Sequence, residues 1–168
     1  MISEKHSAIV WWYENLAYNK DSTSAVVGAK GERLSEIYES VILGIDEKNI
    51  DRVSLKKSNI GYDILSVLSK NNEEPKPIEV KTTTRSQKPF IYITENEWKK
   101  TWLPNYIFHL WVIKERQGLA NLYLIRPADV KKHIPLNKGD GAWVQTKIYA
   151  AEYCKKAVTT LKLSVLSK

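Results

Sequence analysis

Several residue types are scarce in this chain of 168 residues, and each scarcity excludes a class of site. The single cysteine, Cys154, excludes an intramolecular disulfide and a metal site built from cysteines, and it favours a reducing, cytoplasmic location. His6, His109 and His133 lie far apart without ligand spacing, so we expect any bound metal to be a hard ion held by oxygen rather than zinc. No apolar run approaches the roughly 18 residues of a membrane span, and we expect neither a membrane partner nor a signal peptide.

Positive charge is abundant but unevenly distributed along the chain. The formal net charge is +7, and residues 85–168 carry 15 Lys or Arg against 6 Asp or Glu, whereas residues 1–84 carry 11 against 13. A basic half of this kind is typical of proteins that bind polyanions, because each neutralised phosphate releases counterions. Charge alone leaves nucleic-acid binding and a simply solvated basic surface equally open.

The spacing of apolar residues indicates helices and strands in alternation. A period of three to four residues predicts a helix over residues 8–18 and an amphipathic helix over 29–45 with a stripe at Leu34, Ile37 and Val41. Alternation predicts strands at residues 61–68, 78–82, 90–93, 106–113, 119–125 and 142–149, with a turn over 71–77. Thr94 is expected to cap a helix with Glu97, and a short helix to begin at Pro127. This order predicts an α/β fold with a mixed β-sheet flanked by helices.

One constellation carries chemistry: Asp63, then fifteen residues, then Glu79-Val80-Lys81. In a strand, Glu79 and Lys81 point to the same face while Val80 points to the other, and a hairpin would bring Asp63 beside Glu79. Two carboxylates hold Mg²⁺ through oxygen, with the carbonyl of Val80 as a further candidate ligand. Lys81 would position a water and offset developing charge, as phosphodiester hydrolysis requires. A solvated Glu-x-Lys pair on a strand surface would give the same pattern.

The surrounding motifs resemble a known family. Gly61-Tyr-Asp-Ile64, Ile78-Glu-Val-Lys81 and Ile93-Thr-Glu-Asn-Glu-Trp98 resemble the protein NO VEIN C-terminal domain, a branch of the PD-(D/E)XK nuclease superfamily. The resemblance covers about residues 28–130 of one domain, with an N-terminal helical extension (1–24) and a C-terminal extension (131–168). It implies a restriction-endonuclease-like fold, cleavage of DNA that depends on Mg²⁺ (or Mn²⁺), and a role in restriction or phage defence.

The resemblance also implies a catalytic glutamate on the first core helix. Gly28-Ala-Lys-Gly-Glu32 is similar to that element, so Glu32 is the candidate and Glu36 the alternative. On a helical wheel both glutamates, like Glu39, lie opposite the apolar stripe, so a solvated helix face explains them equally well. Two positions depart from the family pattern without removing a ligand: no proline precedes Asp63, and Thr82 stands where glycine is expected.

Basic and aromatic residues supply further candidates. Those that flank the proposed site and could contact phosphates are Lys30, Arg33, Arg85, Lys88, Lys99 and Lys100. Trp98, Trp102 and Trp111 are expected to pack against the sheet, whereas Trp11-Trp12-Tyr13 cannot all face one core and could stack on bases or form a dimer surface.

Three functions remain open beside a DNA endonuclease. They are a structure-specific nuclease of the junction-resolvase kind, a non-catalytic nucleic-acid-binding or assembly module, and an interaction domain with no nucleic-acid role. RNA is not excluded as a substrate. A single small nuclease domain usually needs a second copy to cut both strands, so we expect a homodimer or a larger complex.

Overall fold

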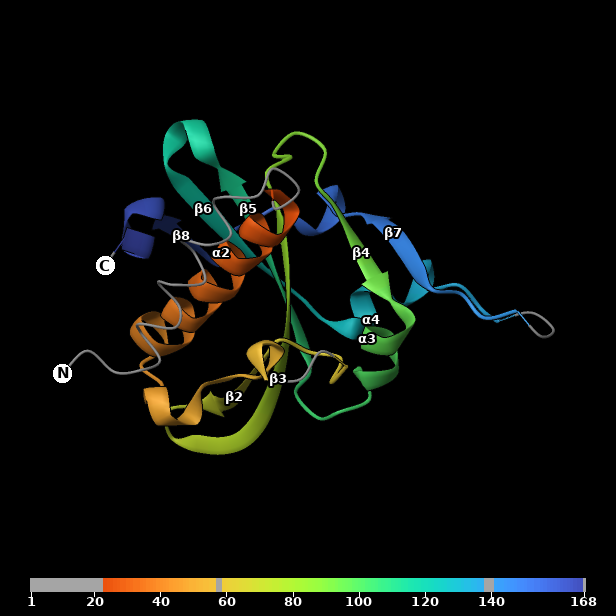
Figure 1. The fold of residues 1–168 in the computed structure, drawn as a ribbon, viewed down its shortest axis with the longest axis horizontal. Helices are drawn as coiled ribbons and strands as arrows, with labels where there is room; N and C mark the ends of the chain where they lie inside the picture. Colours follow the sequence, from red (N-terminus) through yellow and green to blue (C-terminus); the bar gives the residue numbers. More distant parts are fainter. Residues whose placement is uncertain (1–22, 57–58, 138–140, 168) are drawn as a thin grey trace.

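The computed structural model describes residues 23–56, 59–137 and 141–167. The main sheet has the order β1-β2-β3-β5-β6-β8, and a separate two-stranded sheet joins β4 to β7 (Figure 1). The strands are β1 (Asp51–Arg52), β2 (Ile64–Ser69), β3 (Asn72–Thr83), β4 (Phe90–Thr94), β5 (Ile107–Lys114), β6 (Leu119–Ile125), β7 (Gln145–Tyr149) and β8 (Thr159–Lys162). The α-helices are α2 (Thr23–Ile37), α3 (Glu95–Lys100) and α4 (Pro127–Val130). The 8–18 segment and Trp11-Trp12-Tyr13 lie outside the described residues.

The main sheet separates two hydrophobic cores. Leu34 of α2 packs with Ile78, Val80 and Trp111 on one face of the sheet. The other face packs with β4, β7 and α4 through a second set of residues that includes Ile93, Phe108, Ile125, Val130 and Ile148. The central strand β5 is buried on both faces, as a strand between two covered layers must be. In Figure 1, α2 and the β4–β7 pair accordingly lie on opposite sides of the sheet.

The predicted fold class is confirmed: this is a mixed α/β domain, consistent with a restriction-endonuclease-like fold. The β3–β5 pair is parallel, and every other pair in the main sheet is antiparallel. The capping box at Thr94 and Glu97 is present, with the Glu97 amide donating to Thr94 Oγ1 and the Thr94 amide donating to Glu97 Oε2. None of the described helices combines the length and apolar character that a membrane crossing requires.

Two predictions about the strands are wrong. Residues 72–77 continue β3 rather than forming a turn, because the chain reverses tightly at Lys70–Asn71 and Pro75 and Pro77 lie in the extended strand. The predicted strands at 90–93 and 142–149 exist as β4 and β7, but they pair with each other outside the main sheet. β5 already occupies the edge of β3 that a returning β4 would need, so β4 must leave the sheet.

The first core helix ends earlier than the apolar spacing predicts. α2 ends at Ile37 and a π-helical turn (η2, Tyr38–Ile42) follows, in which Leu43 N–H donates to the Tyr38 carbonyl. One extra residue in the turn rotates the following side chains. Val41, predicted to be apolar core, is therefore 70% exposed. Glu39, for which the wheel suggested a solvated face, is fully buried at the start of this turn, because the buried face of the helix follows Leu34, Ser35, Tyr38 and Glu39.

A buried ion pair compensates Glu39. Lys76 Nζ lies 2.7 Å from Glu39 Oε2, and Ser66 Oγ donates to the same oxygen at 2.7 Å. Burial and the charge of Lys76 lower the pKa of the neighbouring His109 to about 3, so this imidazole is neutral at pH 7. The His109 Nδ1 atom contacts Ser35 Oγ at 3.1 Å, inside the core.

Among the three tryptophans predicted to pack against the sheet, two do so. Trp111 is fully buried and its Nε1 donates to Ser35 Oγ, and Trp98 packs on the second core. Trp102 is instead 75% exposed, because α3 ends at Lys100 and no further helical turn brings residue 102 back to the sheet.

Candidate active site

Asp63 is fixed against β3 by its backbone and by its side chain. It immediately precedes β2, where Ile64 pairs with Ile78, so Asp63 lies across from Glu79. The Asp63 amide donates to the Ile78 carbonyl at 2.9 Å, and the Val80 amide donates to Asp63 Oδ2 at 2.8 Å. The predicted approach of Asp63 to Glu79 is therefore confirmed.

Lys81 lies between two carboxylates. Its Nζ is 2.8 Å from Glu79 Oε1 and 2.8 Å from Glu97 Oε2. Glu79 and Lys81 share a face of β3, as the strand period predicts, while Val80 points to the core beneath α2. Glu97 comes from α3 and also accepts the Thr94 amide, so the capping box holds its carboxylate against the ammonium.

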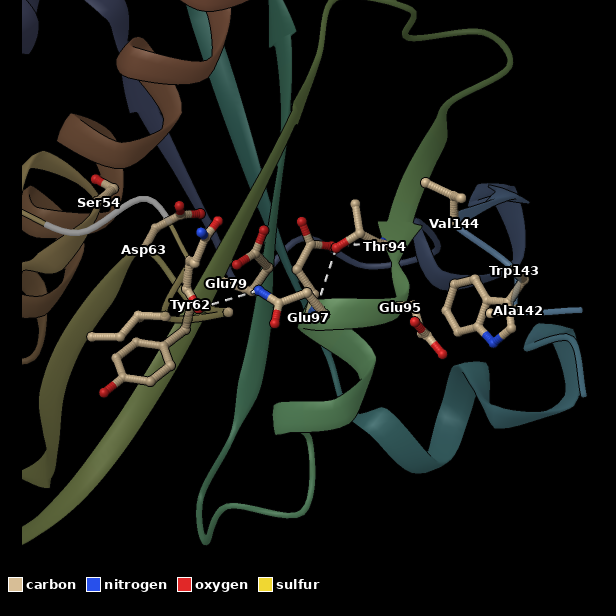
Figure 2. A pocket seen from close by; sticks show the side chains of 14 residues that line it. Ser54, Tyr62, Asp63, Glu79, Thr94, Glu95, Glu97, Ala142, Trp143 and Val144 are labelled. Carbon is tan, nitrogen blue, oxygen red and sulfur yellow. Dashed lines mark hydrogen bonds between the residues drawn. The ribbon is translucent and has the colours of Figure 1, made fainter. Parts of the chain in front are cut away.

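The acidic residues open onto a cavity of about 560 Å³. Asp63, Glu79 and Glu97 line it together with Ser54 and Thr94, and Trp143 and Val144 form part of its wall. Figure 2 shows the side chains of Asp63, Glu79 and Glu97 in a row, with Thr94 and Trp143 beyond them. Lys81 is not among the lining residues, and its ammonium contacts the carboxylates of Glu79 and Glu97.

Burial dominates the electrostatics of this cluster. It raises the pKa of Asp63, although the Val80 amide and the charge of Lys81 oppose the shift. Burial, with the charges of Asp63 and Glu97, also raises the pKa of Glu79 above its ordinary value despite Lys81. For Lys81, burial alone would lower the pKa, but the charges of Glu79 and Glu97 outweigh it and raise the pKa. The ammonium therefore stays protonated at neutral pH.

Glu32 reaches this cluster through Ser54. Ser54 Oγ donates to Glu32 Oε2 at 2.7 Å, and Arg52 Nε lies 3.5 Å from the same oxygen. Burial and the charge of Asp63 raise the pKa of Glu32 to about 7. Glu36 is instead bound by Arg33 and Arg52, at 3.2 and 2.8 Å. The charge of Asp63 therefore acts on Glu32, whereas Glu36 is held by two arginines. Both side chains are largely buried, which does not fit the alternative of a solvated helix face.

A glycine lets α2 approach the site this closely. A Cβ built on Gly31 would overlap the side chain of Thr82 and lie 3.2 Å from Val80 Cγ1. Thr82 occupies the position where the family pattern predicts glycine. Its side chain fits there because the facing helix residue, Gly31, has no Cβ. Because Gly31 directly precedes Glu32, this contact positions the candidate glutamate.

The donor set fits a hard divalent cation. Glu79 and Glu97 contact the one ammonium and Asp63 lies across from Glu79, so carboxyl groups outnumber cations here. Within the described residues, Asp63 Oδ1 and Glu79 Oε2 have no hydrogen-bond partner. No group of three or more Asp, Glu, His or Cys side chains there is arranged to hold a metal. Asp63, Glu79 and the Val80 carbonyl would be the protein ligands, and Mg²⁺ commonly takes its remaining ligands from water and substrate.

The basic residues predicted to contact phosphates are not brought together. Lys30 pairs with Glu115 at 3.6 Å, Arg33 with Glu36, and Lys99 with Glu95 at 3.1 Å. The Lys100 side chain packs beside Gly61 near the cavity. Arg85 and Lys88 are exposed in the loop between β3 and β4, and the Arg85 guanidinium lies over the Phe90 ring at 5.2 Å.

Sequence reasoning missed Glu97, Arg52 and Tyr106 as parts of the site. Glu97 was recognised only as a capping residue, and its contact with Lys81 depends on the packing of α3 beside β3. Tyr106 Oη donates to the Gly61 carbonyl at 2.8 Å, and burial together with Glu79 raises its pKa. A polar residue inside a predicted buried strand or capping box is the only signal that the sequence offers for such partners.

The fold and the site define a mixed α/β domain with an acidic cavity beside a protonated lysine. Residues 35–125 match the family model described as "Protein NO VEIN, C-terminal". The match spans more than half of the 168 residues, and the chain belongs to this family. The predicted family is thus confirmed, and the matched range contains Asp63, Glu79, Lys81 and Glu97. No curated protein and no solved structure matches the chain.

Proposed function

We propose that this chain is a Mg²⁺-dependent nuclease of the PD-(D/E)XK kind that hydrolyses phosphodiester bonds in DNA. The observation that carries the proposal is that Asp63 and Glu79 line one cavity, while Lys81 Nζ lies 2.8 Å from Glu79 Oε1. Three segments that are distant in sequence supply the acidic groups Asp63, Glu79 and Glu97. A solvated Glu-x-Lys pair on a strand surface would not gather carboxyl groups from other segments. Several buried carboxyl groups beside a single ammonium favour a bound cation, because a cation stabilises their ionised forms.

Asp63 and Glu79, with the Val80 carbonyl, would hold the metal ion. Bound Mg²⁺ would supply positive charge to the scissile phosphate and make a nearby water more acidic. Lys81 contributes a fixed positive charge beside Glu79 that offsets charge developing on the phosphate. Glu97 keeps this ammonium protonated and oriented through its 2.8 Å contact. The capping box in turn limits the movement of Glu97.

Glu32 is suited to proton transfer. A carboxyl with a pKa of about 7 is partly ionised at neutral pH, which is the condition under which a general base works best. It is connected to the cavity by Ser54, whose hydroxyl donates to it. We assign Glu32 the acceptance of a proton from water by way of Ser54.

The proposal extends to the setting of the reaction. A domain with one such cavity cuts one strand at a time, so a homodimer or a larger complex would be needed for both strands of a duplex. We include in the proposal a cytoplasmic location, with which the single cysteine is compatible, and a role in restriction or phage defence, which the family resemblance suggests.

A cleavage assay tests the proposal. Purified protein is incubated with plasmid and oligonucleotide DNA in Mg²⁺ or Mn²⁺, beside Asp63→Asn and Lys81→Met. Asn at position 63 can still accept the Val80 amide, so the fold should survive while activity falls at least about hundredfold. Glu95→Gln is the matched control, because Glu95 lines the same cavity but pairs outward with Lys99.

Two readouts decide the result. Electron paramagnetic resonance of Mn²⁺ should detect a bound ion in the parent protein and weaker binding in Asp63→Asn, independently of cleavage. Activity that survives both substitutions, or that is lost equally in Glu95→Gln, contradicts the assignment of the site.

One observation favours a second function, a nucleic-acid-binding module without catalysis. Lys81 already satisfies Glu79 and Glu97, and no three side chains of the described residues converge as metal ligands. DNA binding without cleavage and without Mn²⁺ binding, in the parent protein and both variants alike, would select this function.

A further inference from the structure

The two-stranded β4–β7 sheet presents aromatic rings to solvent. Residues two apart in a strand share a face, and Phe90 pairs with Tyr149 while Tyr92 pairs with Lys147. All four therefore lie on one face, which we call the ribbon face and which also includes Thr94 and Gln145. Tyr92 is 43% exposed and Tyr149 is 65% exposed.

The opposite face of the ribbon packs on the second core, and these contacts do not involve the exposed rings. Ile91, Ile93 and Ile148 are at most 4% exposed and belong to the second core. The isoleucines, and not the tyrosines, thus anchor the ribbon in the core. Large exposed rings gathered on one face are uncommon on a protein surface unless they contact a partner.

Cations accompany the rings. Lys147 Nζ lies 4.0 Å from the centroid of the Phe90 ring and 5.1 Å from that of Tyr149. Arg85 approaches the Phe90 ring from the neighbouring loop at 5.2 Å. Rings that stack on bases beside cations that neutralise phosphates are the combination by which proteins hold single strands. This face is in the basic half of the chain, where the net charge is +9.

The ribbon face leads directly into the acidic cavity. Thr94 ends β4 and lines the cavity with Glu97, and the Glu95 amide donates to the Val144 carbonyl at 2.9 Å, just before β7. Figure 2 shows Thr94 and Val144 at the side of the cavity away from Asp63. From Phe90 to Thr94 the strand rises roughly 13 Å, at about 3.3 Å per residue. A DNA strand whose bases stack on these rings would thus place a phosphate at Glu79, a few nucleotides along from the stacked bases.

We propose that the ribbon face is a stacking platform for unpaired bases, and that the substrate is single-stranded or locally unpaired DNA. The proposal rests on the nuclease function assigned above to the adjoining cavity. A duplex hides the faces of its bases and is read at their edges by hydrogen-bonding side chains. Three of the six residues of the ribbon face carry rings, and Gln145 and Lys147 are its only amide and ammonium groups, so unpaired bases fit it better than a duplex groove does.

Fluorescence anisotropy with labelled oligonucleotides tests the platform. Binding is measured in EDTA, where no cleavage occurs. The probes are a single-stranded DNA 20-mer, its duplex, and an RNA strand of the same sequence. The variant Tyr92→Val/Tyr149→Val removes both rings but keeps residues that favour strands. Trp102→Val removes an exposed ring outside the ribbon and is the matched control.

The parent protein should prefer the single strand, and the double variant should lose at least about tenfold in affinity for it. Trp102→Val should bind as the parent does, and Lys147→Gln should reduce the slope of log K against log salt by about one. Thermal melting verifies that each variant folds. Equal single-strand affinity in the double variant and the parent, or tighter binding of the duplex by the parent, overturns the platform.

Cleavage in Mg²⁺ separates this inference from the proposed function. If single-strand binding depends on the tyrosines but no DNA is cut, the platform stands and the nuclease assignment fails. If cleavage depends on Asp63 while the tyrosine variant binds and cuts as the parent does, the nuclease stands and the platform fails.

Discussion

Glu32 should cost the protein stability at the pH where its proposed chemistry occurs. Its pKa is about 7 in the folded chain, against an ordinary value of 4.5. A raised carboxyl pKa means that the folded state holds the proton more tightly than the unfolded state. Its contribution is fully present below pH 4.5 and is lost as the pH rises through 7. At about 1.4 kcal/mol per pKa unit, the loss above pH 7 amounts to about 3 kcal/mol.

Glu32→Gln removes this penalty, because glutamine is neutral at every pH and its oxygen can still accept from Ser54. The weaker contact with Arg52, at 3.5 Å, is lost in exchange. We expect the variant to gain about 2 kcal/mol relative to the parent protein between pH 5 and pH 8. Urea unfolding at both pH values measures the difference from the midpoint and slope.

Glu36→Gln is the matched control, one helical turn further along α2. Glu36 accepts from Arg33 and Arg52, and its neutralisation leaves the buried Arg52 without its nearest partner. This variant should lose stability at pH 5 and pH 8 alike. If Glu32→Gln also lost stability equally at both pH values, Glu32 would be an ordinary structural carboxylate and the argument from its pKa would be refuted.

Two further predictions concern packing and the buried ion pair. Gly31→Ala should destabilise the protein by about 1 to 3 kcal/mol in urea unfolding, since the added Cβ would overlap Thr82. Gly28→Ala, whose Cβ would have nothing within 4 Å, should be neutral or stabilising. Equal effects of the two substitutions would contradict the close approach of α2 to β3. Lys76→Met should cost about 3 to 5 kcal/mol at pH 7, because it leaves Glu39 charged and buried without its cation, and a loss below about 1 kcal/mol would show that Glu39 needs no such partner.

The local patterns of the sequence predicted the elements better than their pairing. The alternation around Glu79 and Lys81 correctly placed both side chains on one face, since a period of two is a property of any strand. The capping box at Thr94 was correct because its hydrogen bonds join residues three apart. β1 and β8, of two and four residues, were missed because they carry too little pattern of their own.

The errors arose where distant segments compete for the same position. β4 and β7 formed a separate ribbon because β5 had taken the edge of β3, which no local pattern reveals. The π-helical turn after α2 exposes Val41, since the added residue rotates the side chains that follow it. Glu39 is buried because the helix packs its Ser35–Glu39 side against the sheet. Lys76, from β3, compensates the buried Glu39 through an ion pair, although the two residues are far apart in sequence.

By itself, the sequence determined which groups could do chemistry: Asp63 and a Glu-x-Lys strand whose two charged side chains must share a face. Tertiary structure alone decided which groups surround them. Glu97 contacts Lys81, the charge of Asp63 acts on Glu32, and the rings of β4 and β7 share one face of a strand pair that reaches the cavity at Thr94. The physical reason is range, because backbone periodicity acts over a few residues, whereas burial and charge act between whatever segments the fold brings together.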